Sequence, residues 1–296
     1  MWFLLSVLSR LCFASCNILD SHLVRGWFKS PFSLNFIVAL FTIPVAIFLY
    51  VIVAPPNPSP ELLGWIIITG LLQGFYLVPY YVAMEEGDSS VVTSLFTLGR
   101  SLTPILAYLL IAEQLSIWGY VGFFITVFGA IFQSYAREHK KFHYKLAALM
   151  ALSGFMVALF TVTSKVIFDR EGLANGFTHT MLATSLFTLV TVLSPRQAKV
   201  IKSDMRKLKK ILPLVALGAG MSFLANFLGY FSVSLTKASY VTLVAQFQPF
   251  FILMMMAFIS RFGILHTKEA LDKGSVMQKL IGFVIMAGGM ALTLLV

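Results

Sequence analysis

Ten runs of apolar residues, each close to the length needed to cross a bilayer, follow one another along this chain of 296 residues. Short polar or proline-rich segments separate them, such as residues 55–60 with four prolines and residues 85–88 with three acids. A backbone in hydrocarbon must satisfy its own hydrogen-bonding groups, so each run is predicted to form a helix. The expected helices are residues 2–23, 32–53, 61–84, 89–111, 116–135, 144–168, 177–194, 210–235, 238–260 and 276–296.

The composition excludes a soluble protein. Apolar residues make up 58% of the chain and charged residues 11%, whereas a soluble domain is about half apolar and a quarter charged. The sequence therefore predicts one all-α membrane unit with no separate soluble domain. The first apolar run reaches Asn17 and Asp20 without a small-residue cleavage site, so no cleavable signal peptide is expected. Cys12 and Cys16, one helical turn apart, are interpreted as packing residues rather than as a disulfide or metal pair.

The second half of the chain resembles the first. At an offset of 149 residues the two halves share a tyrosine, a serine, a valine and a threonine in the same order, and at an offset of 160 they share two glycines. The 11 residues between the two offsets indicate an insertion between Ser260 and Lys279. The matched pairs are Tyr81 and Tyr230, Ser90 and Ser239, Val92 and Val241, Thr93 and Thr242, Gly122 and Gly282, and Gly129 and Gly289.

The number of helices in each copy decides how the copies are related. Five helices precede residue 140 and five follow it. An odd number of crossings starts the second copy on the opposite side of the membrane. We therefore expect two inverted repeats, residues 1–140 and 141–296, around a central cavity.

Basic residues are sorted between the loops. Of the 22 lysines and arginines, 17 follow the odd-numbered helices, which predicts that these loops are cytoplasmic and that both termini are outside. The net charge of +10 is thus a topology signal and does not indicate nucleic-acid binding. Residues 196–210 are expected to be either a short basic surface helix on anionic lipid head groups or a solvated loop. The 17 are Arg25, Lys29, Arg137, Lys140, Lys141, Lys145, Arg196, Lys199, Lys202, Arg206, Lys207, Lys209, Lys210, Arg261, Lys268, Lys273 and Lys279.

The fourth and fifth apolar runs carry a family resemblance. They combine a small-residue start at Ser89 and Ser90, Glu113 at the end of the fourth run, and then Gly122 and Gly129. With the segment AEQLSIWGYVGFFITVFGAIF from Ala112, this order resembles the EamA-like branch of the drug/metabolite transporter superfamily. In the second copy, Pro249 and the segment GFVIMAGG from Gly282 extend the resemblance. It implies a ten-helix transporter with a substrate cavity between its repeats.

The sequence departs from the family pattern in three ways. Phe262 falls opposite Glu113, so the second copy lacks the glutamate. The segment between the last two helices is longer than usual. The charge bias places the termini outside, whereas ten-helix relatives commonly have them in the cytoplasm, and we follow the charges.

Arg100 is the first candidate for a substrate group. It lies within the fourth run, opposite Pro249 in the repeat alignment. A guanidinium at mid-membrane costs at least ~2.5 kcal/mol on insertion scales, so it must face a partner or a wet cavity. Its planar fork suits a carboxylate or a phosphate. A structural ion pair with another helix, for which Asp20 is one partner, is the alternative.

A second group of candidates is neutral. Pro249 removes a backbone donor and frees the carbonyl of Ala245, and glutamines flank the residue before it. Free carbonyls and carboxamides near the midplane are suitable ligands for a polar metabolite. The alternative for each one singly is a hydrogen bond between helices. The candidates are Gln246, Gln248, Tyr80, Asn226, Tyr230, Gln73, Tyr76 and His179.

Three further residues are candidates for coupling transport to a proton or charge. Asp20 and Asn17 share one face of the first helix, and the Asp20 carboxylate can take up a proton, although pairing with His22 or Arg25 also explains it. Lys165 is the third candidate, and snorkelling to the interface is its alternative explanation.

The sequence contains no phosphate loop, no metal-spaced His or Cys cluster and no ATP-hydrolysing domain. We therefore expect no enzyme, no cofactor and no metal, but a secondary transporter working by alternating access. Its expected substrate is an amino acid or organic anion, and its other partners are membrane lipids, as a monomer or homodimer. The expected location is the plasma membrane, in bacteria the inner membrane. A lipid-carrier or phospholipid flippase, or a membrane accessory protein, is the alternative function.

Overall fold

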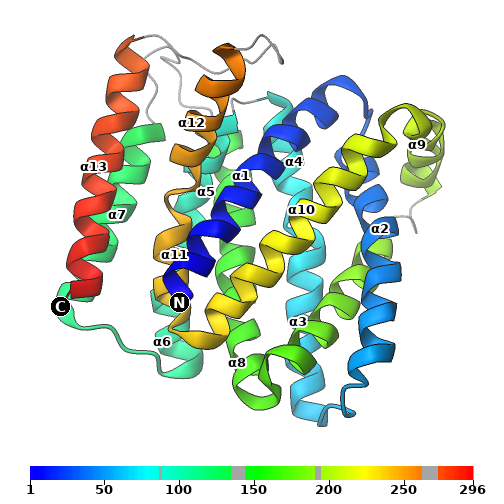
Figure 1. Ribbon diagram of the computed structural model, residues 1–296, viewed down its shortest axis with the longest axis horizontal. Coiled ribbons are helices and arrows are strands. Elements are labelled where there is room, and N and C mark those ends of the chain that lie inside the picture. Colours follow the sequence, from blue (N-terminus) through cyan, green and yellow to red (C-terminus); the bar gives the residue numbers. More distant parts are fainter. Residues whose placement is uncertain (87–88, 135–143, 191–194, 262–272, 296) are drawn as a thin grey trace.

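The computed structural model describes residues 1–86, 89–134, 144–190, 195–261 and 273–295, and within these ranges every regular element is a helix (Figure 1). The all-α fold class predicted from the sequence is confirmed. In chain order the helices are α1 (Trp2–Gly26), α2 (Pro31–Val53), α3 (Pro60–Phe75), α4 (Leu77–Glu86), α5 (Ser89–Arg100), α6 (Thr103–Ile111), α7 (Ile117–Ser134), α8 (Tyr144–Leu189), α9 (Pro195–Met205), α10 (Leu208–Leu235), α11 (Ala238–Ala245), α12 (Gln248–Arg261) and α13 (Lys273–Leu295).

The membrane-crossing segments agree with the apolar runs. By length and composition, seven described helices can cross a membrane, and 95–111 and 117–132 are shorter apolar helices. One of the seven, α8, consists of two arms joined at Gly172, whose φ of 76° lies in the left-handed region that only glycine adopts readily. Counting its arms separately gives, in the described part of the chain, the ten predicted segments.

Prolines end three helices inside the bundle. Pro79, Pro104 and Pro249 each lie near the start of a helix, four residues after the last residue of the helix before it. A proline lacks the N–H that would bond to the carbonyl four residues back, and its ring clashes with that carbonyl. This is why α3, α5 and α11 end where they do. Three expected helices, residues 61–84, 89–111 and 238–260, are thus pairs of shorter helices in line.

The surface and the interior have the polarity of a membrane protein. Large apolar side chains are exposed along α2, α7 and α12; Val51, for example, is 71% exposed. Polar side chains such as Thr69, Thr126 and Ser153 are fully buried. Lipid takes the place of water as the solvent for the apolar exterior, so these helices bury their polar groups against one another.

Two of the interhelical contacts depend on glycine. α7 packs along α13 at one side of the bundle (Figure 1). A methyl group on Gly289 would lie 2.5 Å from the carbonyl oxygen of Gly122, and one on Gly129 would lie 2.8 Å from that of Gly282. The small residues therefore bring the two backbones into contact.

Glu113, which carries part of the family resemblance, caps a distant helix. It follows α6, and its carboxylate accepts hydrogen bonds from the backbone N–H groups of Ala238 at 2.8 Å and Ser239 at 3.0 Å, and from the Ser239 hydroxyl. These donors begin α11, where a negative charge also meets the positive end of the helix dipole. Phe262, its predicted counterpart, and most of the predicted insertion between Ser260 and Lys279 lie outside the described residues.

The basic segment at residues 196–210 forms the short helix α9 and the start of α10. Its structure therefore matches the surface-helix interpretation rather than a loop. α9 lies against the start of α2, where Asp204 accepts a hydrogen bond from the backbone N–H of Lys29 at 3.0 Å and Lys207 donates to the Trp27 carbonyl at 3.0 Å. The ends of α1 and α4 lie at the same end of the bundle, while both chain termini lie away from it (Figure 1). Arg137, Lys140, Lys141 and Lys268 lie outside the described residues.

Candidate functional site

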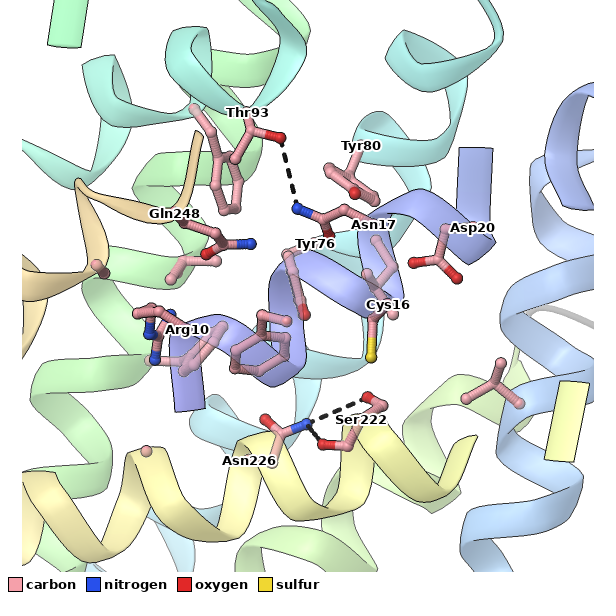
Figure 2. A pocket seen from close by; sticks show the side chains of 18 of the residues that line it. Arg10, Cys16, Asn17, Asp20, Tyr76, Tyr80, Thr93, Ser222, Asn226 and Gln248 are labelled. Carbon is pink, nitrogen blue, oxygen red and sulfur yellow. Dashed lines mark hydrogen bonds between the residues drawn. The ribbon is translucent and has the colours of Figure 1, made fainter. Parts of the chain in front are cut away.

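A cavity of about 100 Å³ lies in the middle of the bundle. Its walls come from both halves of the chain, namely from α1, α2, α4 and α5 and from α8, α10, α11 and α12. Since one water needs roughly 10–15 Å³ of such space, the cavity has room for several waters or for a small organic molecule. Figure 2 shows polar side chains of α1, α10 and the helix breaks directed toward it.

Arg100 lies in the wall of this cavity, at the break between α5 and α6. Only 7% of the residue is exposed, and its guanidinium carbon lies 4.0 Å from the centre of the Phe96 ring. Its Nη1 donates a hydrogen bond of 3.4 Å to Oε1 of Gln248, while its Nε has no partner. The break places Arg100 here because Pro104 ends α5 at this residue.

A second arginine, Arg10 of α1, lines the same cavity. It is 9% exposed, lies over the Phe13 ring at 4.8 Å, and donates from Nη2 to the Ser9 hydroxyl at 3.2 Å. Like Arg100, it has an Nε without a partner. Arg10 was not among the predicted site residues. The signal that could have identified it was available, because an arginine eight residues inside an apolar helix carries the same membrane cost as Arg100.

The two guanidinium groups line the same cavity, so two positive charges face one space. Within the described ranges, neither forms an ion pair with a carboxylate. Asp20 also lines the cavity, but it follows Arg10 by ten residues, about 15 Å along the helix axis. Figure 2 shows Arg10 and Gln248 on one side and Asp20 on the other, with Tyr76 and Asn17 between them. The cavity thus has a cationic end and an acidic end.

A hydrogen-bond network forms one wall around Gln73 of α3. Its Oε1 accepts from the Tyr230 hydroxyl at 2.5 Å and from Thr184 at 2.9 Å, and its Nε2 donates to Asn226 at 3.2 Å. Tyr230 and Asn226 line the cavity, whereas Gln73 lies behind them. Gln73 of α3 therefore positions two lining residues of α10.

Most of the predicted site residues lie around the cavity. Those that line it are Arg100, Gln248, Tyr76, Tyr80, Asn226, Tyr230, Asn17 and Asp20. Besides Arg10, the cavity is lined by polar residues that were not predicted as site residues, namely Cys16, Thr93, Thr161, Ser222 and Thr242. Thr93 accepts a hydrogen bond from Asn17 at 3.4 Å (Figure 2). Single threonines and serines in apolar helices carry too little signal to be selected from sequence.

Three further predicted residues do not line the cavity. Gln246 is fully buried at the break after α11, and neither its amide nitrogen nor its amide oxygen has a partner. His179 binds Glu171 at 2.7 Å beside the turn of α8 at Gly172. Lys165 forms an ion pair with Asp169 at 2.8 Å, one turn along the same helix.

The first part of the chain is similar to a known protein family. The sequence profile described as the EamA-like transporter family matches residues 1–135. The match confirms the resemblance to the drug/metabolite transporter superfamily over this part of the chain. The apolar helices are those of an integral multi-pass membrane protein.

Solved structures share the fold of the whole chain. Among 29 matching chains, a crystal structure described only as that of a protein aligns with 99% of this chain and 96% of its own, with a TM-score of 0.69 and 16% sequence identity. At this identity the similarity concerns the fold alone. No curated protein matches the sequence.

Proposed function

We propose that this EamA-like protein is a secondary transporter that moves a small organic anion by alternating access. The observation that supports this most directly is the pair of buried arginines, Arg10 and Arg100, in one central cavity, where no carboxylate of the described residues pairs with either. Buried charges are costly unless they are paired, and a guanidinium in a membrane marks a substrate path. A bound anion supplies the missing partner.

The arrangement of α7 and α13 supports two inverted repeats, residues 1–140 and 141–296. The repeat alignment equates Gly122 with Gly282 and Gly129 with Gly289. In the structure Gly122 contacts Gly289, and Gly129 contacts Gly282. A two-fold axis generates such a reciprocal contact, in which each residue meets the counterpart of the other. Rocking of the two halves about the cavity would then expose it to each side in turn.

The position of the cavity suggests the side from which substrate enters. Its lining residues on α1 run from Arg10 to Leu23, toward the end of the bundle that carries α9. Nearer the chain termini, α1 and α10 are joined by the Ser6–Ser232 hydrogen bond of 2.5 Å and by Ser9 to the Ala225 carbonyl at 2.7 Å. These bonds hold α1 and α10 together on the side of the termini, and we propose that the cavity opens toward the basic segments, which the charge bias assigns to the cytoplasm.

Flux measurements on Arg100→Ala test this function. The purified protein and the variant are reconstituted in proteoliposomes, with folding of the variant verified by size-exclusion chromatography and thermal unfolding. Uptake of a panel of radiolabelled organic anions is then compared with uptake of sugars and cations of similar size. We expect flux of at least one anion by the native protein and its loss in the variant. Unchanged anion flux in a folded Arg100→Ala protein would remove the arginine from the transport path.

A further inference from the structure

We infer that the site selects dianions: its substrate carries two negative charges, as in a short dicarboxylate or a phosphate monoester. This inference rests on the proposed function and specifies the substrate class of the same cavity. It follows from counting the charges and the free donors that face the cavity.

Both arginines keep unused hydrogen-bond donors. A guanidinium has five N–H donors in a rigid fork. Arg10 has one hydrogen bond, to the Ser9 hydroxyl, and Arg100 has one, to the Gln248 amide oxygen. Both acceptors are neutral, and the Nε of each arginine has no partner although more than nine tenths of each residue is buried. Each fork therefore keeps donors for an oxyanion.

The two arginines carry more positive charge than a monoanion neutralises. Two guanidinium groups place two positive charges in one cavity inside the bundle, where like charges repel one another more strongly than in water. A monoanion neutralises one of them and leaves the second buried and unpaired. Asp20 does not serve as the second counter-charge, because its place on α1 is about 15 Å further along the axis than that of Arg10. A dianion neutralises both.

The same balance disfavours a simple zwitterion. The ammonium group of an α-amino acid lies next to its carboxylate, so an amino acid bound at the arginines would bring a third positive charge beside two others. The sequence alone left amino acids and organic anions as equal classes. The second arginine favours the organic anions.

The walls limit the size of the substrate. Phe13, Phe96, Tyr76 and Tyr80 all line the cavity, and the whole space is about 100 Å³. The Phe13 ring, 4.8 Å from the Arg10 guanidinium carbon, and the Phe96 ring, 4.0 Å from that of Arg100, also hold the two guanidinium groups in place. A short carbon chain between the two anionic groups fits this space better than an extended one.

Three probes of four carbons separate charge from size. Succinate is a dianion, butyrate a monoanion and 2-aminobutyrate an α-amino-acid zwitterion at pH 7.4, and ethyl phosphate serves as a second dianion of different shape. Binding to the purified full-length protein is measured by thermal stabilisation and by isothermal titration, at constant ionic strength. We expect at least one dianion to bind about 10- to 100-fold more tightly than butyrate, since one charge-assisted contact separates them.

Variants of Arg10 show whether this arginine carries the selectivity. In Arg10→Gln we expect dianion affinity to fall about 10- to 100-fold while butyrate affinity changes less than about threefold. Arg10→Lys keeps the charge without the fork and should retain part of the preference, and it replaces Arg10→Gln as the test if the glutamine variant does not fold. Arg170→Gln is the matched control, because Arg170 pairs with Glu61 at the surface and should leave every affinity unchanged.

The outcomes distinguish this inference from the proposed function. Equal binding of butyrate and both dianions, or an equal loss for all anions in Arg10→Gln, would overturn dianion selectivity and leave an anion transporter. Binding of none of the anions, with unchanged behaviour of Arg100→Ala, would overturn the proposed function itself.

Discussion

Gly122 of α7 and Gly289 of α13 touch through their backbones, with a Thr side chain on each helix beside the contact. The Thr126 hydroxyl donates to the Gly122 carbonyl at 2.9 Å, and the Thr293 hydroxyl donates to the Gly289 carbonyl at 3.0 Å. Each hydroxyl also reaches the opposite helix: Thr126 lies 3.3 Å from the Met286 carbonyl and Thr293 lies 3.2 Å from the Gly119 carbonyl, so the two threonines join the helices beside the glycine contact. The contact joins the last described helix of the first half to the last helix of the chain.

Replacing Gly289 with alanine should therefore destabilise the bundle. The added methyl group would lie 2.5 Å from the Gly122 carbonyl oxygen and 2.7 Å from the Thr126 backbone nitrogen of α7, with the Thr126 hydroxyl also within 2.6 Å, so the helices must separate. We expect a loss of about 1–3 kcal/mol in the free energy of unfolding. Gly288→Ala is the control, since nothing lies within 4 Å of a methyl group at that neighbouring position. Thermal unfolding in detergent compares the two, and equal midpoints would contradict the tight backbone contact.

Loss of the Glu113 cap should also destabilise the protein. In Glu113→Ala the first N–H groups of α11 lose a charged acceptor, and we expect a cost of about 1–2 kcal/mol. Glu113→Gln keeps an acceptor oxygen and should lose less. Glu61→Gln, which breaks only a surface ion pair, should change the midpoint little. Denaturation curves of the three variants rank their free energies of unfolding. A Glu113→Ala protein as stable as the Glu61→Gln protein would show that the cap is dispensable.

The Gln73 network should behave as one unit. Tyr230→Phe removes one donor, and interhelical hydrogen bonds in membrane proteins contribute about 0.6 kcal/mol on average and at most about 1.7. Gln73→Leu removes the acceptor shared by Tyr230 and Thr184 and should cost more. The double variant should lose less free energy of unfolding than the two single variants lose together, because both substitutions remove the same hydrogen bond. Strict additivity in this double-mutant cycle would show that the two residues are not coupled.

The membrane orientation can be tested with single cysteines in a cysteine-free background, in which Cys12 and Cys16 are replaced. Asn57 lies in the exposed segment between α2 and α3, and Lys199 is exposed on α9. With basic segments in the cytoplasm, a membrane-impermeant maleimide should label Asn57→Cys in intact cells and Lys199→Cys only after permeabilisation. The reverse pattern would show that the family's common orientation prevails over the charge bias.

The amino-acid sequence by itself determined the class of protein and the course of the backbone. Ten apolar runs can only be helices in a membrane, because hydrocarbon offers no partner for an open backbone. A proline follows four residues after each helix end at Phe75, Arg100 and Ala245, although Pro44 and Pro213 lie inside α2 and α10 without ending them. Arg100 was predicted from a local rule of the same kind, the cost of a charge within a span.

Only the tertiary structure decided which of these residues act together. Sequence spacing places Arg10 and Arg100 on helices 90 residues apart, and no periodicity says that both face one cavity. The same holds for Gln73, which lies behind Tyr230 rather than beside it in the lining, and for Glu113, which caps a helix that begins 125 residues later. Gln246, two residues from Gln248, is buried outside the cavity that Gln248 lines. Local chemistry determines where helices start and stop. The packing of the membrane segments determines which of their faces meet, and those faces form the site.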